Sequence, residues 1–195
     1  TKNTPITMIE SGPTSGVIGA AKLGEMIGEN NIIALDIGGT TAKCSLIENG
    51  NVKINTNYWI EKNNVSSGYP VMVPVVDIVE IGNGGGSIAW EDAGGSFRVG
   101  PKSSGSKPGP AAYGRGGKLP TVTDANVVLG RLSKDNFLGG EMSLDEQAAK
   151  KVISDFAKKL QLSINETAEG ILTILNANMA NAIRSRTVQK GIDPR

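Results

Sequence analysis

Asp36 stands between an apolar run and a pair of glycines, a spacing that suits phosphate chemistry. Residues 32–35 read Ile-Ile-Ala-Leu and predict a fully buried strand, which places the Asp36 carboxylate at the strand's carboxyl end. A carboxylate in that position can hold Mg²⁺ through water. Gly38 and Gly39 lack Cβ, so the backbone can turn sharply and bring its amides against phosphate oxygens. The stretch therefore predicts a phosphate-binding turn with Asp36 as a candidate catalytic residue and metal ligand.

The residues after the glycine pair extend this candidate site. Thr40 and Thr41 add hydroxyl donors, and Lys43 adds a cation beside the phosphates. Residues 42–47 alternate as a strand does, and Asn49-Gly50 is a hairpin signal. Two simpler interpretations stay open: Lys43 faces solvent on a one-sided strand, and the glycines form an ordinary tight turn between strands.

The order of the elements separates this stretch from two commoner phosphate loops. A dinucleotide fold needs a helix directly after the glycines, whereas a strand is predicted here. A P-loop needs Gly-Lys-Ser/Thr, which the sequence lacks. Residues 84–89 fit a loosened dinucleotide motif, but no acid to bind a ribose follows about twenty residues later. The predicted unit is strand, glycine turn, strand and hairpin.

Residues 36–43 resemble a phosphate loop of the actin, sugar-kinase and heat-shock ATPase superfamily. More closely, nearly the whole chain resembles the central part of the hydantoinase A and 5-oxoprolinase family. Four further stretches carry that resemblance, at residues 10–13, 84–90, 99–126 and 176–180. The resemblance implies a hydrolase of the hydantoinase, 5-oxoprolinase or N-methylhydantoinase A kind, which opens a cyclic amide with ATP and Mg²⁺. Acetone carboxylase β subunits resemble the same family, so carboxylation is a second possible chemistry.

The same resemblance implies an α/β fold, with a mixed sheet of the ribonuclease-H-like type and flanking helices, as in actin-like ATPases. Enzymes of that superfamily close two similar halves around the nucleotide, and this sequence carries one phosphate loop and no second copy. We therefore expect residues 1–195 to be a single domain, a partial hydantoinase A domain that is inactive by itself. The implied partners are the missing half, a hydantoinase B type subunit or domain, and a cyclic amide substrate.

A glycine-rich run at residues 100–117 is followed by a further candidate, Asp124. The run holds six glycines and three prolines and predicts a long loop, whose cations can face a phosphate, a substrate carboxylate, a neighbouring subunit or only solvent. Asp124 is a candidate catalytic residue that would hold a metal-bound water or the substrate. It can equally cap the helix predicted at residues 125–132.

The other elements are predicted from hydrophobic periodicity and capping signals. Strands are expected at residues 6–10, 71–81, 87–91 and 96–99. One helix is expected to have Pro13 at its first position. Capping boxes at residues 143–146 and 163–166 each predict the start of a helix, and Gly191 and Pro194 end the second.

Composition excludes several classes of function. The chain has 20 Lys and Arg against 19 Asp and Glu, a net charge of +1, so no field attracts nucleic acid or a membrane surface. No apolar run approaches the roughly 20 residues of a membrane span. With Cys44 alone and no histidine, these residues contain no internal disulfide, Ser-His-Asp triad or His/Cys zinc site. A reduced, cytoplasmic setting is expected.

Two other interpretations of the sequence stay open. A small-molecule kinase using the same loop would accumulate a phosphorylated product without ring opening. A non-catalytic interaction domain would neither bind nor hydrolyse ATP.

Overall fold

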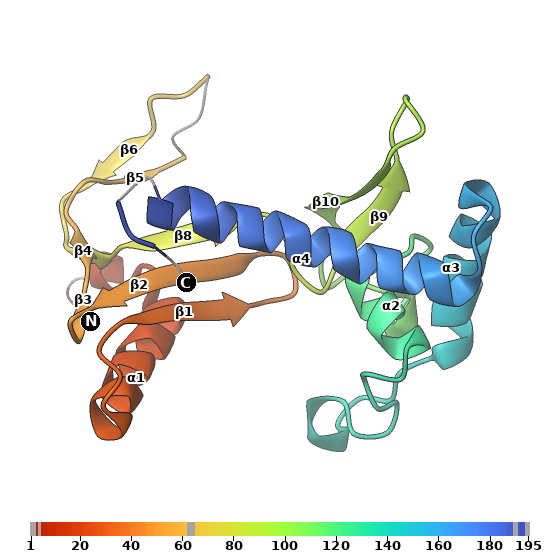
Figure 1. Ribbon diagram of the computed structural model, residues 1–195, viewed down its shortest axis with the longest axis horizontal. Coiled ribbons are helices and arrows are strands. Elements are labelled where there is room, and N and C mark those ends of the chain that lie inside the picture. The colour runs from red at the N-terminus through yellow and green to blue at the C-terminus, as the bar shows by residue number, and fades with distance from the viewer. Residues whose placement is uncertain (1–2, 4, 62–64, 189–190, 194–195) are drawn as a thin grey trace. The chain divides into compact units, whose positions relative to one another are not determined.

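The computed structural model describes residue 3 and residues 5–61, 65–188 and 191–193 (Figure 1). The chain divides into two compact units, the first comprising residues 1–36 and 43–80 and the second residues 37–42 and 81–195. Both units contain helices and strands, so the predicted α/β class is confirmed. That residues 1–195 act as a single domain stays a prediction. Among the described helices, none is long and apolar enough to cross a membrane.

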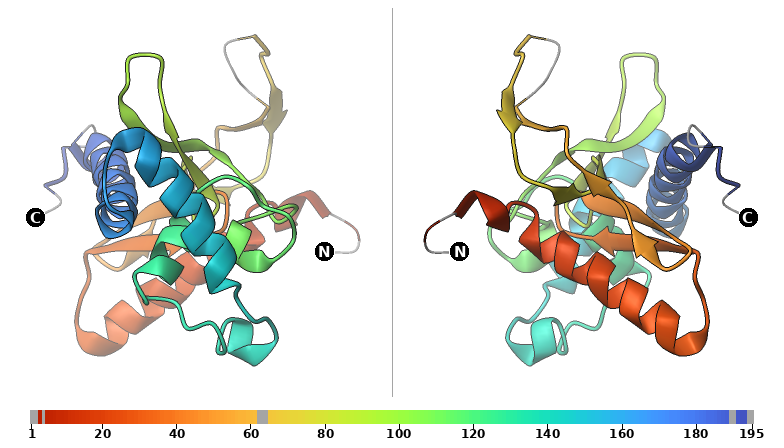
Figure 2. Two further views of the ribbon diagram at one scale, coloured as in Figure 1. Left: turned by 90° about the vertical axis from the view of Figure 1, so that its right-hand side faces the viewer. Right: turned by 90° about the vertical axis from the view of Figure 1, so that its left-hand side faces the viewer.

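The first unit has a small sheet with one helix against it. In neighbour order the main strands are β1 (Ile32–Ile37), β2 (Ala42–Glu48) and β3 (Asn51–Val52), and β8 (Ile78–Ile81) also pairs with β2. Helix α1 (Ser11–Ile27) lies along one face of this sheet, as the right-hand view of Figure 2 shows. Val17, Ile47 and Val76 form the buried core of this unit.

Strand β1 is less buried than its composition predicts. Ile32 and Ala34 pack against the core on the α1 side, whereas Ile33 and Leu35 are 38% and 42% exposed. Successive side chains of a strand point to opposite faces, so a helix on one side covers only alternate residues. The expectation of a fully buried strand at residues 32–35 is wrong for this reason.

Two predicted strands of the first unit are corrected. Residues 6–10 do not form a strand, because Pro5–Met8 form a 3-10 helix, η1, and α1 begins at Ser11. Pro13 is therefore the third helical residue rather than the first. The long strand expected at 71–81 is broken into separate strands, and Pro74, which has no N–H to donate to a sheet, lies at the first break. These strands and their antiparallel partners are β6 (Tyr69–Val71) with β5 (Tyr58–Ile60), and β7 (Val75–Val76) with β4 (Ile54–Asn55).

The second unit combines a β-hairpin with a group of helices. Strands β9 (Ser87–Glu91) and β10 (Phe97–Ser103) pair antiparallel, which confirms the predicted hairpin and extends its second strand. Helices α2 (Val122–Val128), α3 (Glu146–Leu160) and α4 (Ile164–Val188) pack against one another (Figure 1). The Phe97 ring meets the Phe156 ring edge-on, with centroids 5.3 Å apart, and this contact joins the hairpin to α3.

The glycine-rich run at 100–117 is more ordered than predicted. Strand β10 takes up its first residues, and a short 3-10 helix, η2 (Ala111–Tyr113), lies near its end. Ala111 and Ala112 are buried, and Ala112 belongs to an apolar cluster with Val127, Leu144 and Ala149. The run is therefore partly core, which the composition of glycine, proline and cations did not indicate. A second short helix, η3 (Leu138–Gly140), precedes α3.

One predicted capping box is present and the other is not. At the start of α4, the Ser163 Oγ accepts a hydrogen bond from the Glu166 N–H (3.2 Å), and the Glu166 carboxylate accepts one from the Ser163 N–H (2.9 Å). At the start of α3 the cap is Asp145, whose carboxylate accepts from the Ala148 N–H, so the box at 143–146 is wrong. Past α4, Gly191 has φ of 73° as expected, while Pro194 lies outside the described residues.

The capping box at Ser163 makes the start of α4 sensitive to acid. Hydrogen bonds from the Ser163 side chain and backbone lower the pKa of Glu166 below its ordinary value of 4.5. The box is therefore fully present above that ordinary value and is lost as the pH falls through the lower folded-state pKa. In the full-length protein, we expect amide exchange at the start of α4, corrected for intrinsic rates, to accelerate below pH 4.5. Glu166→Gln should remove that acceleration, and an unchanged acid response in this variant would contradict the assignment.

Candidate phosphate-binding site

Residues 38–41, the phosphate turn, connect β1 to β2. The Gly38 N–H donates to the Thr41 carbonyl oxygen (2.9 Å), which closes the turn. Gly38, Gly39 and Thr40 are exposed. The predicted order of strand, glycine turn, strand and hairpin is confirmed by β1, β2 and β3.

A second turn at residues 84–86, the clamp turn, holds the phosphate turn by its carbonyl groups. The Gly85 N–H donates to the Gly38 oxygen (3.0 Å), and the Gly86 N–H donates to the Gly39 oxygen (2.6 Å). The peptide bonds of the phosphate turn are trans, so each carbonyl points opposite to the N–H of the next residue. The amides of Gly39 and Thr40 therefore point away from the clamp turn.

These two amides are suited to receive an anion. Within the part of the chain that the structure describes, neither the Gly39 nor the Thr40 N–H donates a hydrogen bond. Both residues are exposed. Neighbouring backbone N–H groups directed to one open side form the kind of concavity that binds phosphate. The geometry of the phosphate turn thus fits the predicted chemistry.

The clamp turn needs glycine because of how closely it approaches the phosphate turn. A Cβ on Gly84 would lie 2.6 Å from the Gly38 carbonyl oxygen and 2.9 Å from the carbonyl carbons of Gly39 and Thr40. A Cβ on Gly86 would lie 2.9 Å from the Gly39 oxygen. In the sequence these glycines fit a loosened dinucleotide motif and belong to one of the stretches that carry the family resemblance, but neither feature predicted their contact with the phosphate turn. The signal that could have identified them is the run of three consecutive glycines, since close backbone approach is one reason for such a run.

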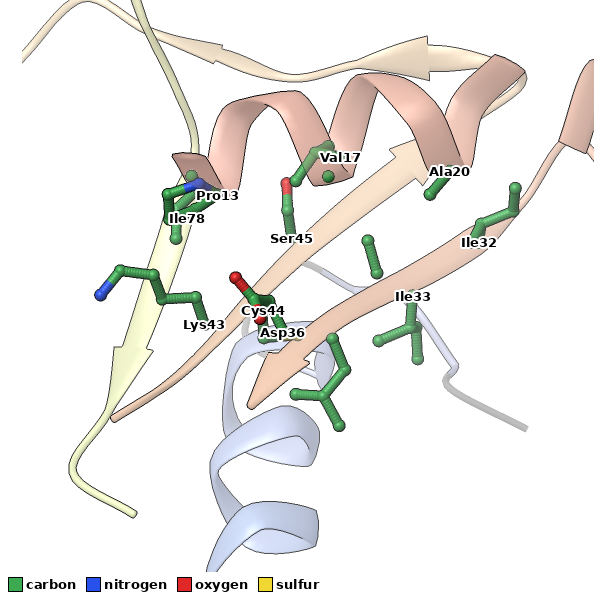
Figure 3. Close-up of a pocket in the computed structure, with 13 residues that line it drawn as sticks. Pro13, Val17, Ala20, Ile32, Ile33, Asp36, Lys43, Cys44, Ser45 and Ile78 are labelled. Atoms are coloured by element: carbon green, nitrogen blue, oxygen red, sulfur yellow. The ribbon is translucent and has the colours of Figure 1, made fainter. Parts of the chain in front are cut away.

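Asp36 and Lys43 line a cavity of about 450 Å³ in the first unit. Its walls come from α1, β1, β2 and Ile78, and apart from Asp36, Lys43 and Ser45 its lining is apolar or glycine (Figure 3). Ser45 Oγ donates to the Asp77 carbonyl oxygen (3.0 Å). The exposed Asp36 carboxylate is thus the anionic group of this cavity.

Asp36 can contribute one ligand to a magnesium ion, and the remaining ligands would have to come from nucleotide phosphates and water. In the described ranges, no three His, Cys, Asp or Glu side chains gather to hold a metal. Mg²⁺ is usually bound by one or two carboxylates together with substrate phosphates and water, rather than by an all-protein cage. A single exposed carboxylate, two residues before Gly38 in the chain, matches that pattern.

Lys43 forms an ion pair that the sequence did not predict. Its Nζ lies 3.0 Å from Glu80 Oε1, and its side chain is 20% exposed. Figure 3 shows the amine pointing away from Asp36, toward the strand that carries Ile78. The pairing follows from the neighbouring positions of β2 and β8, which are distant in sequence. Lys43 is therefore not simply a solvent-facing residue.

The Lys43–Glu80 pair should contribute little stability, because the Glu80 side chain is 58% exposed. We expect a double-mutant cycle with Lys43→Met and Glu80→Gln to give a coupling free energy of about 0.5 kcal/mol, within the range of exposed pairs. The quantity to measure is the opening free energy of β2 by amide exchange in the full-length protein. A coupling several times larger would mean that the pair is shielded from water.

Asp124 is fully buried in the second unit, and both of its carboxylate oxygens accept hydrogen bonds. Oδ1 accepts from the Ala112 N–H (2.8 Å), and Oδ2 accepts from the Thr121 Oγ1 (2.7 Å), the Thr121 N–H (3.0 Å) and the Ala111 N–H (3.3 Å). Burial raises the pKa of this carboxyl, while the hydrogen bonds from Thr121 and the two amides oppose that rise. The predicted helix at 125–132 is corrected, because α2 begins at Val122, ends at Val128 and has Thr121 as its N-cap. Asp124 therefore lies inside the first turn of α2 and does not precede the helix, and there it completes a capping box with Thr121.

Comparison with known proteins gives one family and several named relatives. A family model described as Hydantoinase/oxoprolinase matches residues 1–195. The chain is 39% identical to the caprolactamase subunit alpha of Pseudomonas jessenii, over 97% of this chain and 27% of that protein. It is 35% identical to the 5-oxoprolinase of Saccharomyces cerevisiae, over 94% of this chain and 14% of that protein.

Two solved structures resemble the fold of this chain. One is a crystal structure of the ATP-dependent caprolactamase from Pseudomonas jessenii, with a TM-score of 0.82, 37% identity, and coverage of 97% of this chain and 27% of that one. The other is a nucleotide-free acetone carboxylase, with a TM-score of 0.78, 34% identity, and coverage of 92% and 25%. These matches confirm the predicted fold class, that of actin-like ATPases. The chain spans well under a third of the length of these relatives.

Proposed function

The chain belongs to the hydantoinase/oxoprolinase family, and on that premise we propose that the full-length protein is an enzyme that uses ATP to open a cyclic amide. The observation that carries the proposal is the phosphate turn, whose two exposed amides at Gly39 and Thr40 point away from the clamp turn. Relatives named as a caprolactamase and a 5-oxoprolinase support the class of substrate.

Each predicted site residue has a distinct part in this proposal. The amides of Gly39 and Thr40 bind phosphate oxygens, with Gly38 closing the turn and the hydroxyls of Thr40 and Thr41 as additional donors. Asp36 holds the magnesium ion that accompanies the nucleotide. Phosphate transfer from ATP would activate the amide or carboxyl oxygen of the substrate and make its carbon a better electrophile.

Lys43 and Asp124 have less direct parts. Lys43 supplies a positive charge within the Asp36 cavity while it pairs with Glu80. Asp124 was predicted to be catalytic, and its four protein donors favour a role in holding η2 and α2 in place. We propose that it supports the site through this packing.

The full-length protein is proposed to contain more than this chain. Because the chain covers about a quarter of the relatives whose structures it resembles, the second half of the nucleotide cleft would come from elsewhere in the same protein. Residues 1–195 by themselves would then be inactive. Relatives are named as alpha and beta subunits, which supports a partner subunit, and a hydantoinase B type subunit or domain is the one we propose. Cys44, a buried thiol outside any disulfide, supports a reduced cytoplasmic setting.

Carboxylation is the second candidate function, favoured by the structural match to acetone carboxylase. Both chemistries begin with ATP, so the phosphate turn serves either of them. The distinction lies in the second reactant, which is water for ring opening and bicarbonate for carboxylation.

The deciding experiment measures ATP hydrolysis and the organic product formed by the full-length protein with its co-purified partner subunits. Magnesium-ATP would be offered with 5-oxoproline, hydantoin or caprolactam, and separately with acetone and bicarbonate. We expect a ring compound to stimulate ATP hydrolysis and to yield the open amino acid. Stimulation only with acetone and bicarbonate would support the carboxylase, and accumulation of a phosphorylated, unopened product would support a kinase. If calorimetry detected no binding of magnesium-ATP, the interpretation as a non-catalytic interaction domain would be the one that remains.

A further inference from the structure

We propose that the clamp turn and Thr123 are positioning elements for nucleotide phosphate, acting on the amides of Gly39 and Thr40 through the carbonyls of the phosphate turn. The inference rests on the proposed phosphate binding and adds a function for residues distant in sequence from the loop itself. The bonds that carry it all lie within the second unit.

Each residue of the clamp turn forms a hydrogen bond with a residue outside the turn, Gly85 and Gly86 as acceptors and Gly84 as a donor. The Thr123 N–H and Oγ1 both donate to the Gly85 carbonyl oxygen (2.8 and 2.9 Å). The Ser104 N–H donates to the Gly86 oxygen (2.8 Å). The Gly84 N–H donates to Ser87 Oγ (2.8 Å). The clamp turn is therefore held by α2, β9 and the segment after β10.

The anchor of this network is the start of α2. Asp124 follows Thr123 and is fixed by four donors in the buried interior, so the backbone of α2 has little freedom at that point. Thr123 transmits this fixed position to Gly85, and Gly85 and Gly86 transmit it to the phosphate turn. The path runs from a buried carboxylate to two exposed amides.

Such a network is needed because the proposed phosphate donors are backbone amides, which have no side-chain torsions that could orient them. A backbone amide can be aimed only by fixing its peptide plane, and here that plane is fixed by hydrogen bonds to the carbonyl of the same peptide. Donors that are already aligned lose no orientational freedom when the anion binds. Without the clamp turn, the same two amides would sample several orientations and would bind phosphate less tightly.

The test measures the dissociation constant of magnesium-ATP for the full-length protein by calorimetry, with the melting temperature of the nucleotide-free protein as a second readout. In Gly84→Ala, the new Cβ would lie only 2.6 Å from the Gly38 carbonyl oxygen. The clamp turn and the phosphate turn must therefore move apart. We expect binding to weaken by about tenfold, the equivalent of one charge-assisted hydrogen bond. Gly94→Ala is the control, because its Cβ would meet Asp92 Oδ1 at 3.4 Å, an ordinary contact in the β9–β10 turn.

A second pair of variants isolates the Thr123 hydroxyl. Thr123→Val removes the bond from Oγ1 to Gly85 and is expected to weaken nucleotide binding about threefold. Thr123→Ser keeps that bond and should bind like the wild type. A residue that only stabilises the fold would lower the melting temperature of the valine variant without changing its dissociation constant well below that temperature.

The outcomes separate this inference from the proposed function. If the wild type does not bind magnesium-ATP, the proposed function fails and the positioning role fails with it. If the wild type binds but folded Gly84→Ala binds equally well, or if Gly94→Ala is weakened as much, the positioning role is overturned while phosphate binding stands. Should Gly84→Ala not fold, equal dissociation constants for Thr123→Val and Thr123→Ser would overturn the role.

Discussion

Asp36→Asn is expected to lower kcat/KM for ATP-dependent turnover by the full-length protein by about 100-fold or more. Asparagine keeps the size and the carbonyl oxygen of the side chain but removes its charge. Magnesium is a hard cation that prefers anionic oxygen, and one or two carboxylates usually hold it beside a nucleotide. Among the described residues that line its cavity, the exposed Asp36 is the one that carries a carboxylate, so no other lining side chain can supply this charge.

The dependence on magnesium distinguishes this role from a general loss of stability. We expect the magnesium concentration needed for half-maximal turnover to rise in Asp36→Asn, with part of the lost activity returning at high magnesium. Asp155→Asn is the matched control, because Asp155 is an exposed carboxylate on α3 that pairs only loosely with Lys158 at 3.5 Å. Unchanged turnover in Asp36→Asn would show that the Asp36 carboxylate does not bind the magnesium ion.

Asp124→Ala is expected to destabilise the second unit by about 4 kcal/mol around η2 and the start of α2. The substitution leaves the buried amides of Ala111, Ala112 and Thr121 without their acceptor. Each unsatisfied buried donor costs about 1–3 kcal/mol. Since Asp124 is 0% exposed, water cannot readily take the place of the carboxylate.

The opening free energy of residues 109–128, obtained from amide hydrogen exchange in the full-length protein, measures this effect locally. Asp145→Ala is the matched control, because Asp145 also caps a helix but is exposed, and among the described residues its carboxylate accepts a hydrogen bond only from the Ala148 N–H. That variant should lose about 1 kcal/mol, the usual contribution of a helix cap. Equal losses in the two variants would contradict the structural role of Asp124.

Several features of the fold could be predicted because their causes are local. The turn after Asp36 follows from two adjacent glycines between apolar segments, and the capping box at Ser163 follows from two side chains one helical turn apart. The β9–β10 hairpin follows from alternating residues on either side of Gly94-Gly95. In each case the interacting groups lie within a few residues, so their spacing in the sequence already fixes their geometry.

Other features depended on partners that lie far away in the sequence. The segment at 71–81 has the composition of one strand, but β5, β4 and β2 pair with different parts of it and Pro74 interrupts it. Likewise the burial of β1 depends on α1 covering only one of its faces. Composition shows that a strand is apolar but does not show which neighbours cover it.

At the candidate site, the residue types already specify which groups are available: a carboxylate, two glycines and two hydroxyls close together between two strands. The direction in which these groups point depends on long-range packing. The amides of Gly39 and Thr40 face one side because the carbonyls of Gly38 and Gly39 are bonded to Gly85 and Gly86. A hydrogen bond between segments distant along the chain orients a peptide plane only once the intervening structure has brought them together. Residue types therefore predicted the turn, and packing determined the direction of its donors.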